Sequence, residues 1–556
     1  MRIYPHWDIL HGSDYDAVVP TLLRVRGTEP EELDVGAEVL NAPELLADMD
    51  AAVGRLEQAI RAGERIVIYG DYDVDGVTST ALLLDFLQHV GADVVALLPD
   101  RYADGYGLRP AGVERAADMG GRLIVTVDNG ISAFEALELA AVRGLDVVVV
   151  DHHQQLGPLP RATAIVDPNR VDCTYPFDGL AGVGVVFKVV QALSSRFLQG
   201  RDRRAYLNGL LDLVALGTVA DIMPVTGENR LFIQRGLQVL NRTVRPGLRQ
   251  LLMIAGFGGR PVDAHGIAFR LGPRLNVAGR LDKPDLALRL LCAKDDTEAA
   301  VLADHLHRLN GRRQELQRAG LAEAEALIAP RDLVMDRIVI LLGDTWHLGV
   351  IGLLASRLAE KHARPAVVCS AGRRDGTYTG SARSIPAYDI SAGISACADL
   401  LDSYGGHPGA AGFSLAEDTF EAFRVRLLEH AQQHLAEHDL QARLSVDLML
   451  KPLDISVVTL GELHGLQPFG PGNPTPVFGT RACRVRRART IGRSGEHLKV
   501  ELRCGELSRS AVWWNKGNAA AALQAGTRVD LAFTLQPDTY SDVDAVQLDI
   551  QDMFLS

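Results

Sequence analysis

The chain has 556 residues, of which 47% are hydrophobic and 23% are charged. At about 150 residues per domain this length predicts three or four domains, and the composition excludes a mainly disordered protein. The net charge of −13 by itself argues against a polyanionic partner, but it is uneven: −8 over residues 1–50, −6 over 51–440 and +1 over 441–556. Because no apolar run reaches the roughly 18 residues that span a bilayer, and no secretory signal is visible, we expect a cytoplasmic protein without membrane contact.

The first half of the chain predicts a parallel sheet. Residues 1–50 form an acidic N-terminal extension. From residue 51 onward, short apolar runs alternate with helical patterns, which is typical of βαβ units whose sheet is covered on both faces. The predicted strands of this first α/β domain, residues 51–230, are 65–70, 93–98, 123–127, 147–150 and 164–166.

The second half predicts three further parts. A helical connector, residues 231–330, leads to a second α/β domain, residues 331–440. Beyond it, residues 441–556 show short strands separated by turn signals, which favours a small all-β barrel or sandwich. The expected fold class is therefore α/β, with two α/β domains joined by a helical connector and followed by a C-terminal barrel.

Six cysteines are scattered along the chain, and none falls in a CxxC pair. This spacing supports neither a zinc ribbon nor a thioredoxin motif. In a long chain without a visible secretory signal, we expect the six to be reduced and to act as small buried apolar residues. They are Cys173, Cys292, Cys369, Cys397, Cys483 and Cys504.

Carboxylates and histidines follow four apolar runs. Three segments come directly after predicted strands: DYDVDG at 71–76, VDNG at 127–130 and DHH at 151–153. Because the carboxyl ends of parallel strands meet at one edge of a sheet, these side chains should converge there. The fourth segment, TVAD at 218–221, ends a predicted helix that can return to the same edge. Several carboxylates in one place repel one another, so a cation must compensate their charge.

The residue types favour a divalent metal site. Carboxylates with one or two imidazoles suit Mn²⁺ or Mg²⁺ better than a thiolate-seeking metal. Two such ions about 3.5–4 Å apart can clamp the attacking and leaving oxygens of a phosphoryl transfer. Each segment also has an ordinary interpretation: an EF-hand start, a turn, or a helix cap. The EF-hand interpretation lacks its glutamate, because Leu82 stands at the twelfth position. The shared position after successive strands favours the metal site.

Eight motifs carry a family resemblance. In chain order, DYDVDG, VDNG, DHH, GTVADIMP (217–224) and GPRLNVAGR (272–280) resemble the DHH phosphoesterase superfamily, and within it the RecJ single-stranded-DNA exonucleases. The associated DHHA1 domain is suggested by WHLGVIGLLASRL (346–358), GSARS (380–384) and GGHPGAAGF (405–413). The resemblance is dense over 65–415 and more diffuse over 440–556, where RecJ proteins carry an OB barrel.

The resemblance implies a set of site residues. Two Mn²⁺ or Mg²⁺ ions would be bound, with Asp128 as the natural bridge between them. His153 would contact the scissile phosphate or donate a proton, and Asp71 and Asp151 would orient the ligands. The implied catalytic residues are thus His153, Asp128 and Asp71, and the implied metal ligands are Asp73, Asp75, Asp128, His152 and Asp221.

The resemblance also implies an activity. The chain would be a metal-dependent 5′→3′ exonuclease that degrades single-stranded DNA to mononucleotides in DNA repair and recombination, by attack of a metal-activated water on the phosphodiester. Its substrate would be a strand with a 5′ end, a helicase and a single-strand-binding protein are possible partners, and we expect a monomer. A terminal phosphate needs a pocket, for which the candidates are Arg109, Arg280, Ser381, Arg383 and His407.

The C-terminal barrel carries a basic stripe. The chain has 50 arginines and seven lysines, and arginine binds phosphate bidentately. In a regular strand, Arg484 and Arg486 would share one face, and Arg487 and Arg489 the other. Trp513 and Trp514 would also point to opposite faces, so one should lie in the core while the other is free to stack on a base.

Two alternatives remain open from the sequence alone. The same chemistry could serve a phosphodiesterase of short oligonucleotides or cyclic dinucleotides, although the extra barrel argues against it. The chain could instead be a non-catalytic scaffold that binds single strands at the replisome, although its set of metal ligands is intact. A P-loop motor is not supported, because no GxxxxGK[ST] segment is present.

Overall fold

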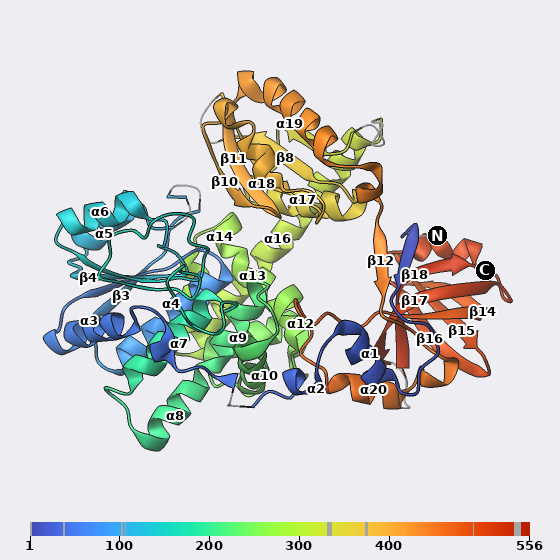
Figure 1. Ribbon diagram of the computed structural model, residues 1–556, viewed down its shortest axis with the longest axis horizontal. Coiled ribbons are helices and arrows are strands. Elements are labelled where there is room, and N and C mark those ends of the chain that lie inside the picture. Colours follow the sequence, from blue (N-terminus) through green and yellow to red (C-terminus); the bar gives the residue numbers. More distant parts are fainter. Residues whose placement is uncertain are drawn as a thin grey trace. The chain divides into compact units, whose positions relative to one another are not determined.

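The computed structural model describes residues 3–36, 39–101, 104–105, 107–330, 336–372, 376–492, 494–538 and 546–556. The chain divides into two compact units (Figure 1). The parallel-sheet unit contains Glu31–Arg313 and Pro468–Pro474, and the barrel unit contains Met1–Pro30, Gln314–Gln467 and Thr475–Ser556. Among the described residues, no helix combines the length and the apolar character needed to cross a membrane.

The parallel-sheet unit is built on five parallel strands in the order β3-β2-β4-β5-β6. The prediction of these strands is confirmed to within a residue at each end. Alternate side chains point to opposite faces, so that Ile68 packs in one core and Val67 in another. Burial on both faces explains why each strand is a continuous apolar run. The strands are β2 (Ile66–Tyr69), β3 (Val94–Leu97), β4 (Leu123–Val127), β5 (Asp146–Val150) and β6 (Ala164–Val166).

Helices cover both faces of this sheet. Two of them, α5 (Pro110–Asp118) and α6 (Phe134–Val142), lie on one face, and α3 (Met49–Ala62), α4 (Val74–His89) and α7 (Gly182–Ser194) lie on the other (Figure 1). The next layer is helical as predicted. It contains α8 (Gly200–Gly209), α9 (Leu211–Ala220), α10 (Gly227–Leu240), α11 (Pro246–Leu252), α12 (Ala264–Gly266), α13 (Gly272–Asn276), α14 (Ala278–Leu281) and α15 (Asp285–Cys292), with two π-helical turns at Met253–Phe257 and Ile267–Leu271.

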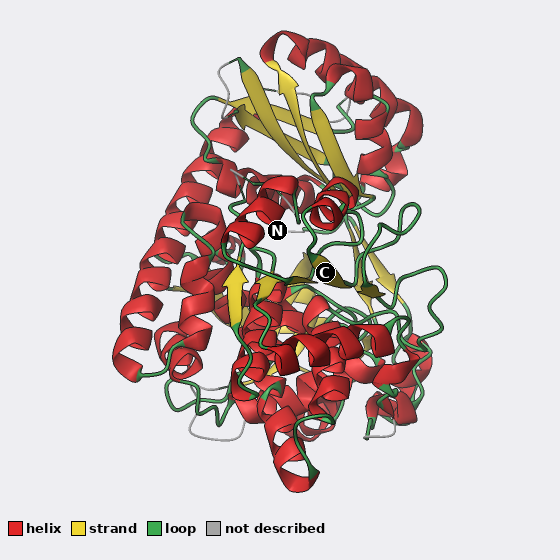
Figure 2. Ribbon diagram, turned by 90° about the vertical axis from the view of Figure 1, so that its left-hand side faces the viewer, coloured by secondary structure: helices red, strands yellow, loops and turns green. Residues whose placement is uncertain are grey.

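The second α/β domain lies in the barrel unit. It follows α16 (Asp296–Ile328), a helix of 33 residues. Its sheet has the order β10-β11-β9-β8-β7, in which only β7 and β8 are parallel. Figure 2 shows these strands beside a layer of helices. The elements are β7 (Val339–Gly343), α17 (Leu348–His362), β8 (Ala366–Ala371), β9 (Thr377–Arg383), α18 (Ile390–Ser395), β10 (Ser403–His407), β11 (Ala410–Ala416) and α19 (Phe420–His434).

The C-terminal strands close into a barrel. Pairing of β14 with β17 joins the ends of the run β14-β15-β16-β18-β17, so five strands form a closed barrel. The N-terminal extension contributes β1 (His6–Ile9), which pairs in parallel with β12 (Arg443–Val446), and Trp7 stacks on Phe554 at 4.3 Å. The remaining elements are α1 (Val18–Arg26), β13 (Leu448–Met449), α20 (Val457–His464), β14 (Phe478–Ile491), β15 (His497–Cys504), β16 (Leu507–Trp513), β17 (Arg528–Pro537) and β18 (Val546–Leu555).

Two cysteines depart from the sequence prediction. Cys483 and Cys504 form a disulfide between β14 and β15, so the expectation that all six are reduced is wrong. The two lie opposite each other on paired strands with Cα atoms 4.5 Å apart, which is the close spacing of a non-hydrogen-bonded antiparallel pair. Sequence spacing does not reveal that pairing. The free cysteines are Cys173, Cys292, Cys369 and Cys397.

Candidate metal centre and nucleic-acid interface

The strand-end segments meet at one edge of the parallel sheet. Asp71, Asp128 and Asp151 follow β2, β4 and β5 by one or two residues. The register of the sheet continues into them, because the backbone N of Asp128 donates to the O of Val150 at 3.0 Å. Asp73 is the N-cap of α4 and accepts from the N of Gly76 at 3.0 Å. Sheet topology alone therefore gathers carboxylates that lie up to 80 residues apart.

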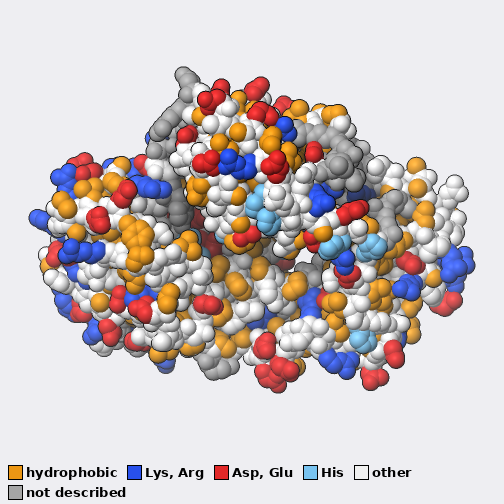
Figure 3. Space-filling view, turned by 45° about the horizontal axis from the view of Figure 1, so that its top comes forward, with side chains coloured by type: hydrophobic (Ala, Val, Ile, Leu, Met, Phe, Trp, Pro, Cys, Tyr) orange, Lys and Arg blue, Asp and Glu red, His pale blue; other side chains and the backbone are white. Residues whose placement is uncertain are grey.

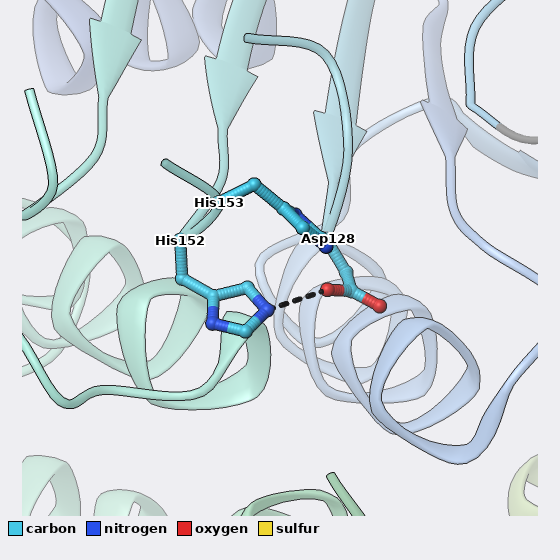
Figure 4. Close-up of side chains that lie close together, drawn as sticks. All are labelled: Asp128, His152 and His153. Atoms are coloured by element: carbon cyan, nitrogen blue, oxygen red, sulfur yellow. Dashed lines mark ion pairs between the residues drawn. The ribbon is translucent and has the colours of Figure 1, made fainter. Parts of the chain in front are cut away.

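His152 lies at the centre of this cluster. Its Nε2 is 3.1 Å from Oδ1 of Asp128, 3.7 Å from Oδ2 of Asp221 and 3.8 Å from Oδ2 of Asp75. Figure 4 shows the imidazole ring pointing at the Asp128 carboxylate. Asp221 reaches the cluster from the C-terminal end of α9, as its position after a predicted helix suggested.

Among the described residues, three overlapping groups of side chains could each hold a metal ion, because the ligand atoms within each group all lie within 4.8 Å of one another. They are Asp128 with His152 and His153; Asp75 with His152 and Asp221; and Asp71 with Asp73 and Asp128. Asp128 and His152 each belong to two of these groups, so the groups are continuous with one another. All seven residues predicted as catalytic or metal-binding in this unit are thus brought together.

Asp128 owes its direction to an unusual backbone conformation. Its φ of +61° lies in the left-handed region, which aspartate adopts more readily than most residues. The following Asn129 is buried, and its Nδ2 donates to the O of Val127 at 3.0 Å. The turn after β4 is therefore a rigid support for the carboxylate.

Two backbone amides fix the Asp75 carboxylate. The N of Gly182 donates to Oδ2 at 2.6 Å, and the N of Val183 donates to Oδ1 at 2.9 Å. A Cβ on Gly182 would lie 2.8 Å from Cβ of Asp128, and one on Gly217 would lie 2.8 Å from Oδ1 of Asp75. Both glycines let helices approach the carboxylates closely. Gly182 is not among the residues predicted from the sequence, because its role depends on how closely α7 approaches the carboxylates.

Asp151 faces His153 rather than the other acids. Its Oδ1 lies 2.6 Å from Nδ1 of His153, and its Oδ2 accepts from the N of Ile131 at 3.0 Å. These hydrogen bonds overcome burial and lower the pKa of Asp151 to about 2. The same bond to Asp151 raises the pKa of His153 to about 9 against the effect of burial. The two shifts favour an ionised Asp151 beside a protonated His153.

The other acids show the cost of gathering like charges. Burial, and then repulsion from Asp73, raises the pKa of Asp75 to about 7. Burial and repulsion from Asp75 raise the pKa of Asp221 to about 9, and they raise that of Asp128 well above its ordinary range. Burial lowers the pKa of His152 to about 4, so its imidazole is neutral. The neutral imidazole is the form that binds a divalent cation, and a cation bound here would offset the repulsion and favour the ionised form of the acids.

An orphaned oxygen also fits a cation. Oδ1 of Asp71 is buried, and within the described part of the chain it has no hydrogen-bond partner. Asp167, after β6, repeats this pattern: its Oδ2 is buried and has no hydrogen-bond partner among the residues that the structure describes, and burial raises its pKa to about 8. Asp167 continues the series of strand-end acids directly after the predicted strand 164–166, but it was not among the predicted site residues.

The candidates for a terminal-phosphate pocket fall in both units. In the barrel unit, Ser381 and Arg383 lie on β9, with Nη1 of Arg383 3.2 Å from Oγ of Ser381. His407 is exposed on β10, and β11 lies between these two strands. In the parallel-sheet unit, Arg109 is exposed directly before α5, and Arg280 is half-buried on α14. Each unit thus offers an exposed or half-buried cation near its glycine-rich motifs.

The basic strand of the barrel differs from its prediction. Arg484, Arg486, Arg487 and Arg489 are all exposed, whereas Val485 is buried. A β-bulge at Arg486 explains this, because Val485 pairs with Leu502 and Arg487 pairs with the next residue, Glu501. The extra residue inverts the alternation. The prediction that these arginines occupy two faces is therefore wrong, and all four reach solvent.

The two tryptophans differ in exposure, as expected, although only Trp513 lies in β16 and Trp514 follows it. Trp513 is buried, and Trp514 is 49% exposed. The edge of Trp514 contacts His497 with ring centroids 4.8 Å apart. On the face drawn in Figure 3, basic and acidic side chains are interspersed, so the net charge does not describe the local surface.

Three family models match the chain. They are the DHH family, N-terminal domain, over residues 65–218; the DHHA1 domain over 335–433; and the RecJ OB domain over 446–552. Each match falls on a part of the structure described above: the parallel sheet, the mixed sheet and the barrel.

Curated relatives and solved structures agree with these matches. The RecJ exonuclease of Dickeya dadantii is 37% identical, over 96% of both chains. That of Bacillus subtilis is 37% identical over 91% of this chain, which spans 63% of that longer relative. Crystal structures of Thermus thermophilus RecJ in complex with Mn²⁺ and with Mg²⁺ cover 99% of this chain at 30% identity, with TM-scores of 0.81 and 0.77, and 80% and 78% of the Thermus chain.

Fold, site and matched models together define the class, a multidomain DHH-family protein with a strand-end metal centre. Identity above 30% across nearly the whole of a relative then settles the family. The chain belongs to the RecJ family of single-stranded-DNA-specific exonucleases.

Proposed function

We propose that this chain is a metal-dependent exonuclease that hydrolyses single-stranded DNA in the 5′→3′ direction and releases mononucleotides. The observation that carries the proposal is the cluster of buried carboxylates around one neutral imidazole, His152. The substrate class follows from the family, whose curated members are single-stranded-DNA-specific exonucleases. Repair and recombination are the processes that consume such strands.

The metal ligands would be Asp73, Asp75, Asp128, His152 and Asp221. When bound, Mn²⁺ or Mg²⁺ ions compensate the carboxylate charge and make a water nucleophilic at neutral pH. The Gly182 and Val183 amides each donate to one oxygen of Asp75 and would hold its carboxylate in a fixed orientation. Asp71, with its unpartnered Oδ1, would hold a water or a ligand in place.

His153 would act on the phosphate. Its Nδ1 lies 2.6 Å from Oδ1 of Asp151, so Nε2 of the imidazolium would be the atom that donates to the phosphate. A cation with a fixed donor can bind a non-bridging phosphate oxygen and stabilise the charge that develops on it. The same proton can pass to the leaving oxygen. Asp151 keeps the ring oriented and charged.

The strand would be bound by arginines and one aromatic side chain. Arg109, Arg280, Ser381, Arg383 and His407 are our candidates for the 5′-phosphate. Arg484, Arg486, Arg487 and Arg489 would contact backbone phosphates, and the exposed face of Trp514 would stack on a base. None of these contacts distinguishes one base from another, so we expect no sequence preference.

The remaining assignments follow from the same proposal. The five-domain division would place the extension at 1–50, the catalytic domain at 51–230, the connector at 231–330, DHHA1 at 331–440 and the OB domain at 441–556. The protein would act as a cytoplasmic monomer, with a helicase supplying unwound strands and a single-strand-binding protein as a second partner.

Digestion of end-labelled strands tests the proposal. Single strands labelled at the 5′ or the 3′ end are incubated with Mn²⁺ and sampled over time, with the wild type beside Asp128→Ala. We expect early mononucleotide release from the 5′ label only, and none from the variant. Early release from the 3′ label would refute the polarity. Binding without hydrolysis would favour a scaffold, and cleavage limited to very short substrates would favour an oligonucleotide phosphodiesterase.

A further inference from the structure

A short segment from late in the chain belongs to the parallel-sheet unit. Residues Pro468–Pro474 (PFGPGNP) pack with Glu31–Arg313, although the chain before and after them belongs to the barrel unit. The segment is a closed turn, in which the N of Asn473 donates to the O of Gly470 at 3.0 Å and the reverse bond measures 2.9 Å. Pro471 and Gly472 (φ +77°) occupy its central positions, as a type II turn requires.

This turn touches the residues that follow Asp221. The N of Val225 donates to the O of Pro471 at 2.7 Å. A Cβ on Gly470 would lie 2.5 Å from Cγ2 of Val225, whose side chain is only 3% exposed. The contact between the turn and the segment after Asp221 therefore leaves no room for even one methyl group.

The buried guanidinium of Arg230 fixes the same turn. Arg230 lies on α10 and is 0% exposed. Its Nε donates to the O of Leu33 at 2.9 Å, and its Nη1 reaches the O of Pro468 at 3.4 Å. The O of Pro468 also accepts from Nδ2 of Asn473 at 2.9 Å. Burying a cation is costly unless it is hydrogen-bonded. Arg230 donates hydrogen bonds to two backbone oxygens, which an apolar side chain of the same size could not do.

The residues after Asp221 need such support. Ile222 has φ +62°, a left-handed conformation that is strained for a β-branched residue, and its side chain is 72% exposed. Strained backbone persists only where its surroundings over-determine it. Asn229 supplies one restraint, with Nδ2 donating to the O of Pro224 at 3.0 Å and to the O of Gly179 at 2.5 Å. The Val225–Pro471 bond supplies another.

We propose that the Gly470–Asn473 turn and Arg230 are positioning elements for the metal ligand Asp221. The turn holds residues 222–226, so that the Asp221 carboxylate stays within ligand distance of Asp75 and His152. A late part of the chain thereby stabilises the metal centre through backbone contacts. This inference rests on the proposed function, because it takes Asp221 as a ligand.

Mn²⁺ binding to the full-length, metal-free protein tests the inference. Gly470→Ala places a methyl group against Val225, and Gly461→Ala on α20 is the matched control, because a Cβ there has no atom within 4 Å. Calorimetry and the electron-spin resonance of bound Mn²⁺ report the number and affinity of ions. We expect Gly470→Ala to bind one of two ions about tenfold more weakly, with unchanged affinity for single-stranded DNA. The control should match the wild type.

Two further variants separate positioning from general damage. Val225→Ala removes the atom that the new methyl group meets, so the Gly470→Ala/Val225→Ala double variant should recover most of the Mn²⁺ affinity. Arg230→Lys, which keeps a donor, should weaken the same ion about threefold, and Arg230→Met should weaken it about tenfold. Unchanged Mn²⁺ binding in both Gly470→Ala and Arg230→Lys overturns the inference. A wild type that binds no Mn²⁺ overturns the proposed function instead.

Discussion

The acidic centre and the basic barrel strand are built on different principles. The centre is assembled by topology: parallel strands end at one edge, and a carboxylate placed after each end must meet its neighbours there. The basic strand is assembled by register, because one bulged residue, Arg486, decides whether Arg487 faces solvent or core. Strand order can be inferred from a sequence, whereas a single-residue bulge cannot. A site assembled by strand order can therefore be predicted from a sequence, whereas one that depends on strand register cannot.

The largest expected effect concerns Asp128, a carboxylate that belongs to two of the ligand groups. Asp128→Ala should reduce hydrolysis by about 10³-fold, because a bridging ligand serves both ions and each supplies several kcal/mol of charge stabilisation. The metal-free variant should nevertheless unfold at a higher temperature than the wild type, since it has lost a buried, repelled carboxylate. Single-turnover assays and calorimetric melting measure the two effects. Asp202→Ala, at an exposed site on α8, is the control and should change neither.

The second effect concerns the glycine that lets α7 approach the centre. Gly182→Ala should lower the hydrolysis rate about 100-fold, because its Cβ would displace Asp128 or Asp75 by the better part of an ångström. Gly54→Ala on α3 makes the same chemical change where no atom lies within 4 Å. It should leave the rate unchanged and stabilise its helix slightly. Equal rates in the two variants would contradict the close packing at Gly182.

Asp128 and Gly182 illustrate which parts of the site can be predicted from the sequence and which cannot. The sequence predicted the parallel sheet and gathered the seven centre residues, because both depend on chain order and on apolar runs. Gly182 and Asp167 were not predicted. Gly182 matters through contacts between α7 and the carboxylates, and Asp167 follows a predicted strand but belongs to none of the four motifs. The prediction was wrong about Cys483 and Arg487, because both depend on which residues of β14 and β15 stand opposite each other. Sequence reasoning failed where register decides the outcome.

The third effect is a dependence of stability on pH that the cation should abolish. In the metal-free protein the pKa values of Asp75 and Asp221 are raised to about 7 and 9, and that of His153 to about 9. A pKa raised by folding contributes stability at low pH that is lost as the pH rises through the folded value. Between about pH 6.5 and 9, Asp221 and His153 act in this direction throughout, and Asp75 does so only up to its folded pKa of about 7. Asp151, with a pKa of about 2, contributes a constant amount.

The melting temperature of the metal-free protein should therefore fall by about 5 °C between pH 6.5 and 9. Saturating Mn²⁺ should raise it and flatten the slope, because the ionised carboxylates then face a cation. Differential scanning calorimetry with and without chelator measures both curves. A metal-free melting temperature that rises over this pH interval would show that the acids do not repel one another in the folded state.

The fourth effect concerns Trp514, the exposed tryptophan of the barrel. Trp514→Ala should weaken binding of single-stranded DNA about tenfold, since stacking of a base on an aromatic ring contributes about 1–3 kcal/mol. Trp514→Phe retains a ring and should recover most of that affinity. Fluorescence anisotropy with a labelled strand measures both variants. An unchanged affinity in Trp514→Ala would mean that the exposed indole only packs against His497.

The smallest effect is the sharpest test of the bulge. Arg487→Ala should weaken binding of single-stranded DNA about threefold and lower the slope of log K against log salt by about 0.7, the value for one phosphate contact on a single strand. Arg201→Ala, exposed on α8, should leave the slope unchanged. If the strand alternated without a bulge, Arg487 would point into the barrel beside Val485. The substitution would then alter the melting temperature and leave the salt slope as it is, so the two readouts separate a side chain placed by register from one placed by simple alternation.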